Sequence, residues 1–351
     1  MFKNSKAHIE SKANKTDSVF YFNANIYNDP VGNQSAKIAR FSQSISSGSV
    51  VDLPENYYLA IVRFAISHML IPLYQFKDNF YTVTITREDG VNSTQVFLNY
   101  SNIGNFSQYG YTNPVFFYSQ FANMVSEALK DAHTQLFPGD PAPFLHYGPE
   151  TERFTLYVPD DANYYDGVDT HATIHFNSNL FQQLQLINAT FNGFNSALGK
   201  DYTINYFSDS LGFNLYTGGT DPYYFFTQER SALYLLNEVQ SIVFTSTSIN
   251  VTKEFIGKND GQGNVGSLSI LADFVPDQST GRDLSEYQYN VQGPPRLVNL
   301  TNTIPVTEID YQIGIRFRDG TIVPLYLEPG ETCEVKFGFF KKSLYDNDFT
   351  Y

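Results

Sequence analysis

The sequence predicts an all-β protein, and three observations support that prediction. The 351 residues include 31 Phe and 26 Tyr but no Trp, and these aromatic residues favour strands. The turn formers Asn, Asp, Gly, Ser and Pro are frequent between the apolar runs. Strand-like segments also recur at short spacing along the chain, as in β-sandwiches and jelly rolls. We therefore expect a β-sandwich rather than an α/β enzyme.

The first half of the chain opens with strand candidates of two kinds. Residues 18–27 alternate between apolar and polar side chains, which is typical of a half-buried strand. Residues 57–71 form the longest apolar run of this half, and its continuous character predicts a central strand covered on both faces. Residues 80–87 and 94–100 are predicted to pair as a hairpin.

One amphipathic helix is expected in this half. Asn113 is a favourable N-cap residue, and Pro114 suits the first helical position. Apolar side chains then recur at steps of three and four as far as Leu136, where a Pro-Gly pair follows. The pattern predicts a helix over residues 114–137 whose apolar face packs onto the sheets.

Short aromatic strand candidates continue from residue 144 to residue 227, and the composition changes without a sharp boundary. The best division lies near residues 229–233. We predict a basic N-terminal arm at 1–17, a β-rich domain at 18–232, a jelly-roll or sandwich portion at 233–342 and a tail at 343–351.

The clearest strand pattern lies near the C-terminus. Residues 308–318 alternate strictly, an Asp-Gly pair follows, and residues 322–327 form a partner strand. With residues 332–340 as a third strand, the pattern predicts an antiparallel meander. Because proline has no N–H to donate to a ladder, Pro324 predicts a sheet edge, where Ile322 and Pro324 are candidate contacts for a neighbouring subunit.

The charge distribution limits the classes of partner that the protein can bind. A formal net charge of -14 argues against a protein that coats nucleic acid, which needs a field of Lys and Arg. The exception is residues 1–16 of the N-terminal arm, where four lysines stand against the single acid Glu10: Lys3, Lys6, Lys12 and Lys15. This arm is either a solvated tail or a segment that contacts other subunits or nucleic acid.

Cysteine usage and hydropathy point to an intracellular folding environment. The single cysteine, Cys333, excludes an internal disulfide and a zinc site built from several cysteines. Its place on the apolar face of a strand predicts a buried side chain. We expect neither a signal peptide nor a membrane span, because no apolar run reaches the necessary length.

No motif supports catalysis. The phosphate-loop look-alike at residues 193–201 has one residue too many between its glycines and Asp201 where Ser or Thr is needed. His171 and His175 on one strand would stand about 13 Å apart, too far for a shared metal ion. An acidic loop could hold a cation or simply be solvated: Asp160, Asp161, Asp166 and Asp169. We assign no catalytic, cofactor-binding or metal residues and expect no cofactor.

Five blocks of the second half carry a family resemblance, in this order: 236–254, 269–276, 295–300, 309–313 and 335–342. Together they are similar to jelly-roll capsid proteins. The chain most resembles the penton, or minor capsid, proteins of polinton-like viruses, adintoviruses and virophages.

The resemblance implies a structural subunit and not an enzyme. Such a subunit is assembled inside the host cell into the virion, an icosahedral shell around double-stranded DNA. Its implied partners are its own copies, as a pentamer at the vertices, and other capsid proteins. Contact of the arm, through Lys3, Lys6, Lys12 and Lys15, with packaged DNA stays open beside the solvated tail.

The strand candidates outnumber the eight of one jelly roll. We therefore expect a jelly-roll β-sandwich with a second or inserted β domain and one packed helix. Two alternatives stay open: a double jelly-roll major capsid protein that forms trimers, and a carbohydrate-binding or host-attachment β-sandwich.

Overall fold

The fold is divided into two compact units. The computed structural model describes residues 19–32, 35–46, 48–67, 71–101, 113–161, 163–164, 171–185, 187–194, 196–205, 215–216, 222–232, 238–257, 265–275, 286–291, 293 and 295–345. One unit, called here the sandwich, combines the described residues up to Ile71 with those from Val239 onward, and the other, the inserted unit, is Pro72–Glu238. The chain thus leaves the sandwich once and returns to it once.

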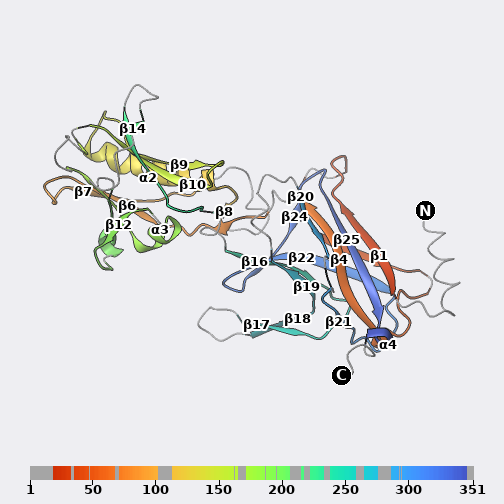
Figure 1. Ribbon diagram of the computed structural model, residues 1–351. Helices are drawn as coiled ribbons and strands as arrows, with labels where there is room; N and C mark the ends of the chain where they lie inside the picture. Colours follow the sequence, from red (N-terminus) through yellow and green to blue (C-terminus); the bar gives the residue numbers. More distant parts are fainter. Residues whose placement is uncertain are drawn as a thin grey trace. The chain divides into compact units, whose positions relative to one another are not determined.

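The sandwich is almost entirely β-structure (Figure 1). Its strands are β1 (Val19–Tyr27), β2 (Lys37–Ile38), β3 (Arg40–Ser44), β4 (Tyr57–Ser67), β16 (Val239–Thr245), β17 (Glu254–Gly257), β18 (Val265–Leu268), β19 (Ile270–Phe274), β20 (Glu286–Asn290), β21 (Val298–Asn299), β22 (Glu308–Phe317), β23 (Ile322–Pro324), β24 (Tyr326–Leu327) and β25 (Thr332–Lys341). A single helical turn, α4 (Lys342–Tyr345), follows the last strand.

The strand order is that of a jelly roll. One sheet runs β1-β25-β4-β20, with β21 also on β4, and the other runs β19-β16-β22, with β3 and β23 on the far side of β22. If the principal strands are counted in chain order, with β20 and β21 as one, the sheets read 1-8-3-6 and 5-4-7-2. This double Greek key confirms the predicted jelly roll.

Aromatic rings from both sheets fill the core between them. The ring of Phe64 on β4 lies 5.1 Å from that of Phe244 on β16 and 4.7 Å from that of Phe274 on β19. Tyr311 on β22 packs against Phe337 on β25 with their ring centres 5.2 Å apart. β4 pairs on both sides, with β25 and with β20 and β21, so the prediction of a central strand is confirmed.

The predicted C-terminal meander is wrong in its third strand. β22 and β23 do pair across the Asp-Gly turn, where Gly320 has φ +85°. β25, however, pairs with β1 and β4 in the opposite sheet. Alternating strands from two packed sheets present the same pattern in sequence, because each buries every second side chain against the shared core.

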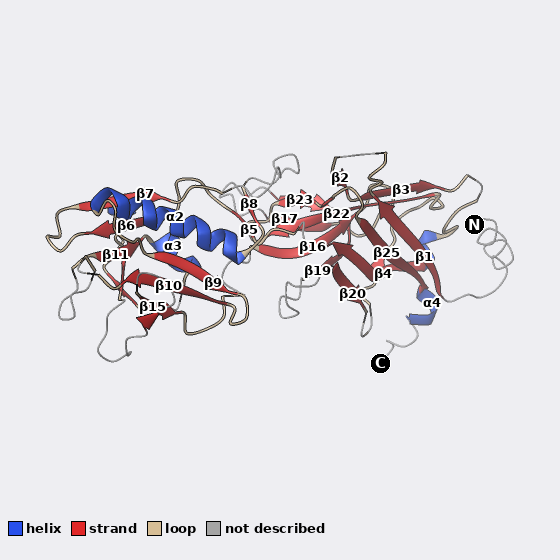
Figure 2. Ribbon diagram, turned by 90° about the horizontal axis from the view of Figure 1, so that it is seen from above, coloured by secondary structure: helices blue, strands red, loops and turns tan. Residues whose placement is uncertain are grey.

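The inserted unit adds two larger sheets, one two-stranded sheet and the long helix (Figure 2). Its elements are β5 (Tyr74–Gln75), β6 (Thr82–Thr86), β7 (Ser93–Phe97), β8 (Pro114–Val115), α2 (Tyr118–Leu136), β9 (Phe144–Gly148), β10 (Arg153–Pro159), β11 (Thr173–Phe176), α3 (Ser178–Gln183), β12 (Ala189–Phe191), β13 (Tyr202–Ile204), β14 (Leu215–Tyr216) and β15 (Tyr223–Thr227). The two larger sheets run β14-β15-β10-β9 and β12-β13-β11-β6-β7, and the predicted β6–β7 hairpin is confirmed.

The helix α2 packs on strands of both sheets, as its apolar face predicted, but it begins later than residue 114. Pro114–Val115 instead forms β8 and pairs with β5. The side chain of Gln120 accepts a hydrogen bond of 3.0 Å from the Phe116 backbone N–H, and the helix starts at Tyr118. The local cap signal at Asn113 therefore yields to pairing with a strand about 40 residues earlier.

The sequence predicted two consecutive domains with a boundary at residue 232, whereas the structure has one unit inserted into the other. β1, β3 and β4 belong to the sandwich because they pair with β25 and β22 near the C-terminus. The two ends of the inserted unit lie side by side, since the Glu238 backbone N–H donates to the Leu73 carbonyl at 3.0 Å.

Candidate assembly surfaces

The predicted edge strand is at an edge of its sheet. β23 pairs with β22 through Ile322 opposite Arg316 and Pro324 opposite Gly314, and it has no second partner strand among the described residues. A Cβ on Gly314 would lie 2.8 Å from Ile322 Cγ2, so glycine permits the close approach of the two strands. The later residues of the predicted strand are covered, because β24 pairs with β2.

A polar cluster orders the turn that follows β16. Asp310 on β22 is buried and accepts hydrogen bonds from the hydroxyls of three successive residues and from the backbone N–H groups of the last two. Thr247 donates from its hydroxyl at 2.6 Å and from its backbone at 3.0 Å, and Ser248 donates from its backbone at 2.8 Å. The hydroxyls of Ser246 and Ser248 complete the set.

The same turn is held from a second side by a buried amide. Asn302 Oδ1 accepts from the Asn250 backbone N–H at 2.9 Å, and Asn302 Nδ2 donates to the Ser248 carbonyl at 3.1 Å. Both partners of Asn302 are therefore backbone groups, which fixes the path of the chain between β16 and β17.

The hydrogen bonds decide the ionisation of Asp310. Burial alone would raise the pKa of its carboxyl, but the donors from Ser246, Ser248 and Thr247 outweigh burial and hold the pKa well below its ordinary value. The ionised form is thus built into the folded state. The carboxylate acts as an internal cap for the turn.

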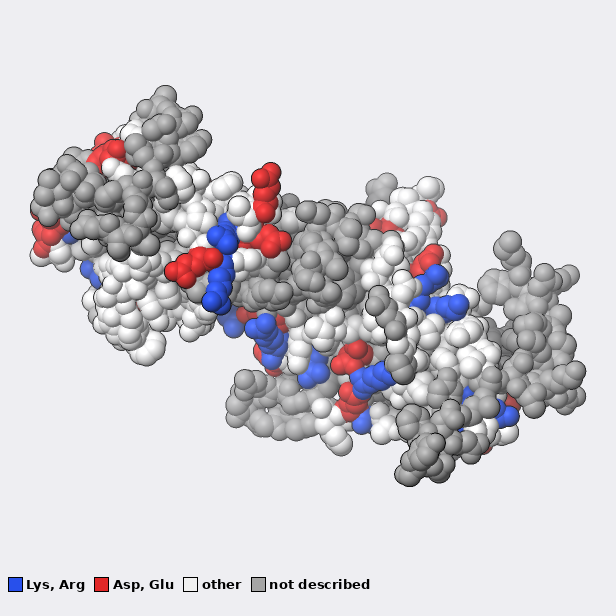
Figure 3. Space-filling model, in the orientation of Figure 1, with Lys and Arg blue, Asp and Glu red and all other residues white. Residues whose placement is uncertain are grey.

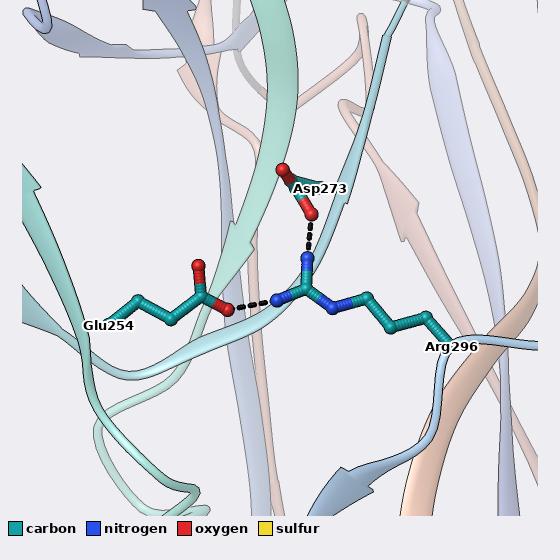
Figure 4. Close-up of polar contacts among 3 residues, drawn as sticks. All are labelled: Glu254, Asp273 and Arg296. Carbon is teal, nitrogen blue, oxygen red and sulfur yellow. Dashed lines mark hydrogen bonds and ion pairs between the residues drawn. The ribbon is translucent and has the colours of Figure 1, made fainter.

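Glu254, Asp273 and Arg296 form a cluster of charged side chains, called here the clasp (Figure 4). Arg296, just before β21, forms ion pairs with Glu254 on β17 and with Asp273 on β19. These side chains retain between 33% and 45% of their exposure, so solvent weakens each pair. The clasp joins three segments that are distant in sequence, one of which is β17 of the β17–β18 hairpin.

The histidines singled out in the sequence have different surroundings. His175 is buried between hydroxyls, with Nδ1 at 3.0 Å from Thr203 Oγ1 and Nε2 at 2.9 Å from Thr173 Oγ1. Burial, assisted by Lys200, lowers the pKa of His175 to about 4. His171 Nδ1 lies 3.0 Å from Glu88 Oε2 instead.

Of the other residues that the sequence singled out, some lie within the described structure and some lie outside it. Cys333 is buried, as predicted. The basic arm with Lys3, Lys6, Lys12 and Lys15 lies outside the described residues, as do Asp166 and Asp169 of the acidic loop. The neighbouring Asp161 accepts a hydrogen bond from the Asn163 backbone N–H at 2.9 Å, as a loop-ordering residue does. In the described parts of the chain no helix is long and apolar enough to cross a membrane.

Charge is unevenly divided between the two units. The inserted unit contains 6 basic and 17 acidic residues, and the rest of the chain contains 16 basic and 19 acidic residues. On the face in Figure 3, Lys and Arg lie interspersed with Asp and Glu, and much of the described surface is uncharged. The inserted unit therefore holds most of the net negative charge.

Sequence reasoning found the edge strand but missed the turn cluster and the clasp. Both depend on residues that the chain brings together from more than 20 positions away. Asp310 gave no local signal, because it stands at a polar position of the alternating pattern over residues 308–318, where an acid is ordinary.

Comparisons with known proteins extend over both units. The family model of the Sputnik minor capsid protein V18/19 matches residues 20–342. The structural protein V19 of Sputnik virophage is 30% identical over 208 residues, which cover 56% of this chain and 94% of that protein.

Two solved structures share the fold. A chain in the cryo-EM structure of the Sputnik virophage superimposes with a TM-score of 0.76 at 24% identity, covering 94% of this chain and 99% of that one. The mavirus penton protein superimposes with a TM-score of 0.66 at 17% identity, covering 92% of this chain and 99% of that one.

Proposed function

Because the chain belongs to the Sputnik minor capsid protein V18/19 family and is thus a structural component of a virion, we propose that it forms the vertex penton as a ring of five copies. The family membership also supports a purely structural role with no catalysis. Its partners are then its own copies and the other proteins of an icosahedral shell around double-stranded DNA.

The architecture favours the penton over a double jelly-roll major capsid role. A double jelly roll needs two sandwiches with the same strand order, and only the sandwich unit has it among the described residues. The sheets of the inserted unit run β14-β15-β10-β9 and β12-β13-β11-β6-β7, and the helix α2 packs on strands of both. One jelly roll with an inserted unit is the observation that carries the proposal, and the structural likeness to a mavirus penton protein supports it.

The charge distribution supports different surroundings for the inserted unit and for the N-terminal arm. With 17 acidic against 6 basic residues, the inserted unit is repelled by DNA phosphates. The arm at 1–17 carries Lys3, Lys6, Lys12 and Lys15 and is attracted by them. We propose that the arm contacts packaged DNA or neighbouring subunits during assembly and that the inserted unit stays away from the genome.

Deleting residues 1–16 is expected to weaken particle formation without destabilising the fold. The family match begins only at residue 20, and the β1 strand begins at Val19, so the deletion removes no residue of the described sheets. Thermal unfolding should stay nearly unchanged while the yield of particles falls. A charge-reversed arm with all four lysines changed to Glu is the matched variant, and loss of folding in either would contradict this role.

The stoichiometry of the purified protein tests the proposal as a whole. A penton subunit gives a five-copy species under native conditions, whereas a major capsid protein of the double jelly-roll kind gives three copies. A stable monomer that binds glycans would instead support a host-attachment sandwich.

A further inference from the structure

β1 is the longest edge strand of the sandwich. Its nine residues, Val19–Tyr27, pair with β25 on one side, and no described strand pairs on the other. The other described edge strands of the sandwich have five residues or fewer: β3, β19, β20, β21 and β23. The β1–β25 register runs without a bulge, so the free edge is regular over about 30 Å.

The edge of β1 also lacks the features that normally protect an edge. Natural sheets block unwanted pairing with charged residues, proline, bulges or short strands. β23 is short and contains Pro324, β3 begins with Arg40, and β19 contains Asp273 within the clasp. β1 has the sequence VFYFNANIY, with no charged residue and no proline.

The side chains of β1 alternate between the core and the outer face of the sheet. On the core side, Phe20 stacks on Phe339 with their ring centres 4.7 Å apart, and Phe22 meets Phe41 at 6.0 Å. On the outer side, Tyr21 and Tyr27 are 53% and 50% exposed. The strand is therefore packed onto the core on one face and carries two exposed aromatic rings on the other, the kind of residue that protein interfaces favour.

The chemistry of the edge selects its occupant. A row of unpaired backbone N–H and C=O groups is satisfied in full by another extended strand, as in β-augmentation. A chain with a net charge of -14 repels its own copies, and the uncharged β1 edge is where two copies approach with little repulsion. A shell subunit also meets its own copies at high local concentration.

We propose that the outer edge of β1 docks a strand of a second copy of this chain, so that a sheet continues from one subunit into the next. This inference rests on the proposed function, since it names the contact through which the ring assembles. In a ring the contact is heterologous: β1 of one subunit meets a different element of its neighbour.

Hydrogen exchange of the full chain tests the pairing directly. In the assembled oligomer, amides of β1 that face outward should exchange at least about tenfold more slowly than in the dilute monomer. Amides of β25, already paired on both sides with β1 and β4, should change little and serve as the internal control. Protection of the β1 edge already in the monomer would contradict the proposal, because the occupant would then belong to the same chain.

A protecting lysine tests the edge independently. Asn25 is exposed on β1 and lies opposite Glu334, so Asn25→Lys adds an edge charge without a like-charged partner across the strand pair. The concentration for half-maximal assembly should rise by about tenfold or more. The matched control is Val91→Lys, since Val91 is 82% exposed in a turn of the inserted unit. Thermal unfolding of both variants confirms that each is folded.

The outcomes separate this inference from the proposed function. Five-copy wild-type assembly with unprotected β1 amides, or with Asn25→Lys assembling like Val91→Lys, would overturn the β1 contact and leave the penton role standing. A wild-type chain that stays monomeric at every concentration would contradict the penton role and this contact together.

Discussion

The Asp310→Ala variant is expected to lose about 3–5 kcal/mol of unfolding free energy, the cost of removing one partner from a buried, charge-assisted cluster. Alanine leaves the hydroxyls of residues 246–248, and the backbone N–H groups of Thr247 and Ser248, without the acceptor that orders them. It also opens a space beside β22, where Asp310 is 4% exposed. Denaturant unfolding followed by tyrosine fluorescence measures the loss.

The control for Asp310 is another aspartate that accepts a backbone hydrogen bond in a turn. Asp319 accepts from the Thr321 N–H at 2.8 Å but is exposed, so Asp319→Ala should cost well under the Asp310 value. Equal losses in the two variants would contradict the role given to the buried cluster.

The pH dependence of stability carries the same information. The folded-state pKa of Asp310 is depressed, so its contribution is fully present above the unfolded-state pKa and is lost as the pH falls through the folded-state value. Asp310→Asn should remove this part of the acid sensitivity, because the amide does not ionise. An unchanged acid-unfolding profile in Asp310→Asn would contradict the assignment.

Excising the inserted unit is the second large change, and the sandwich is expected to fold without it. Replacing residues 72–238 by a short Gly-Ser linker closes a small gap, since the Leu73 carbonyl and the Glu238 N–H are already bonded at 3.0 Å. Among the described residues, the hydrophobic core of the inserted unit runs from Leu73 to Ala232, so the excision removes none of the described sandwich core. Circular dichroism should show a β-rich chain with one cooperative unfolding transition.

A point variant tests whether the cores of the two units unfold independently of each other. Phe121 is fully buried on α2 within the core of the inserted unit, and Phe121→Ala should cost about 3–5 kcal/mol there. In the full chain this should lower one unfolding transition and leave that of the sandwich in place. An excised chain that is unfolded, or a Phe121→Ala chain that loses both transitions together, would contradict two separate cores.

Local patterns predicted single strands well. They did not predict which strands pair, and the errors arose where long-range pairing overrode a local signal. The continuous apolar run at residues 57–71 identified β4 as central, and the Asp-Gly pair after β22 identified its turn. The helix start at Asn113 was wrong because β8 pairs with β5, and the third strand of the meander was wrong because β25 crosses to the other sheet.

The candidate assembly residues show the same limit. Pro324 revealed an edge, since a missing N–H is a local property that survives any context. The edge of β1 was not predicted as a contact, because an edge is defined by the strand that is missing beside it. Likewise the cluster around Asp310 joins β22 to a turn about 60 residues earlier, and no spacing rule announces it.

The mass of the purified protein under native conditions tests the central claim most directly. Native mass spectrometry across a concentration series should find a dominant species at five times the chain mass of 39.8 kDa, with the monomer as the dissociated form. A dominant three-copy species, or a monomer that persists at the highest concentration, would contradict the penton.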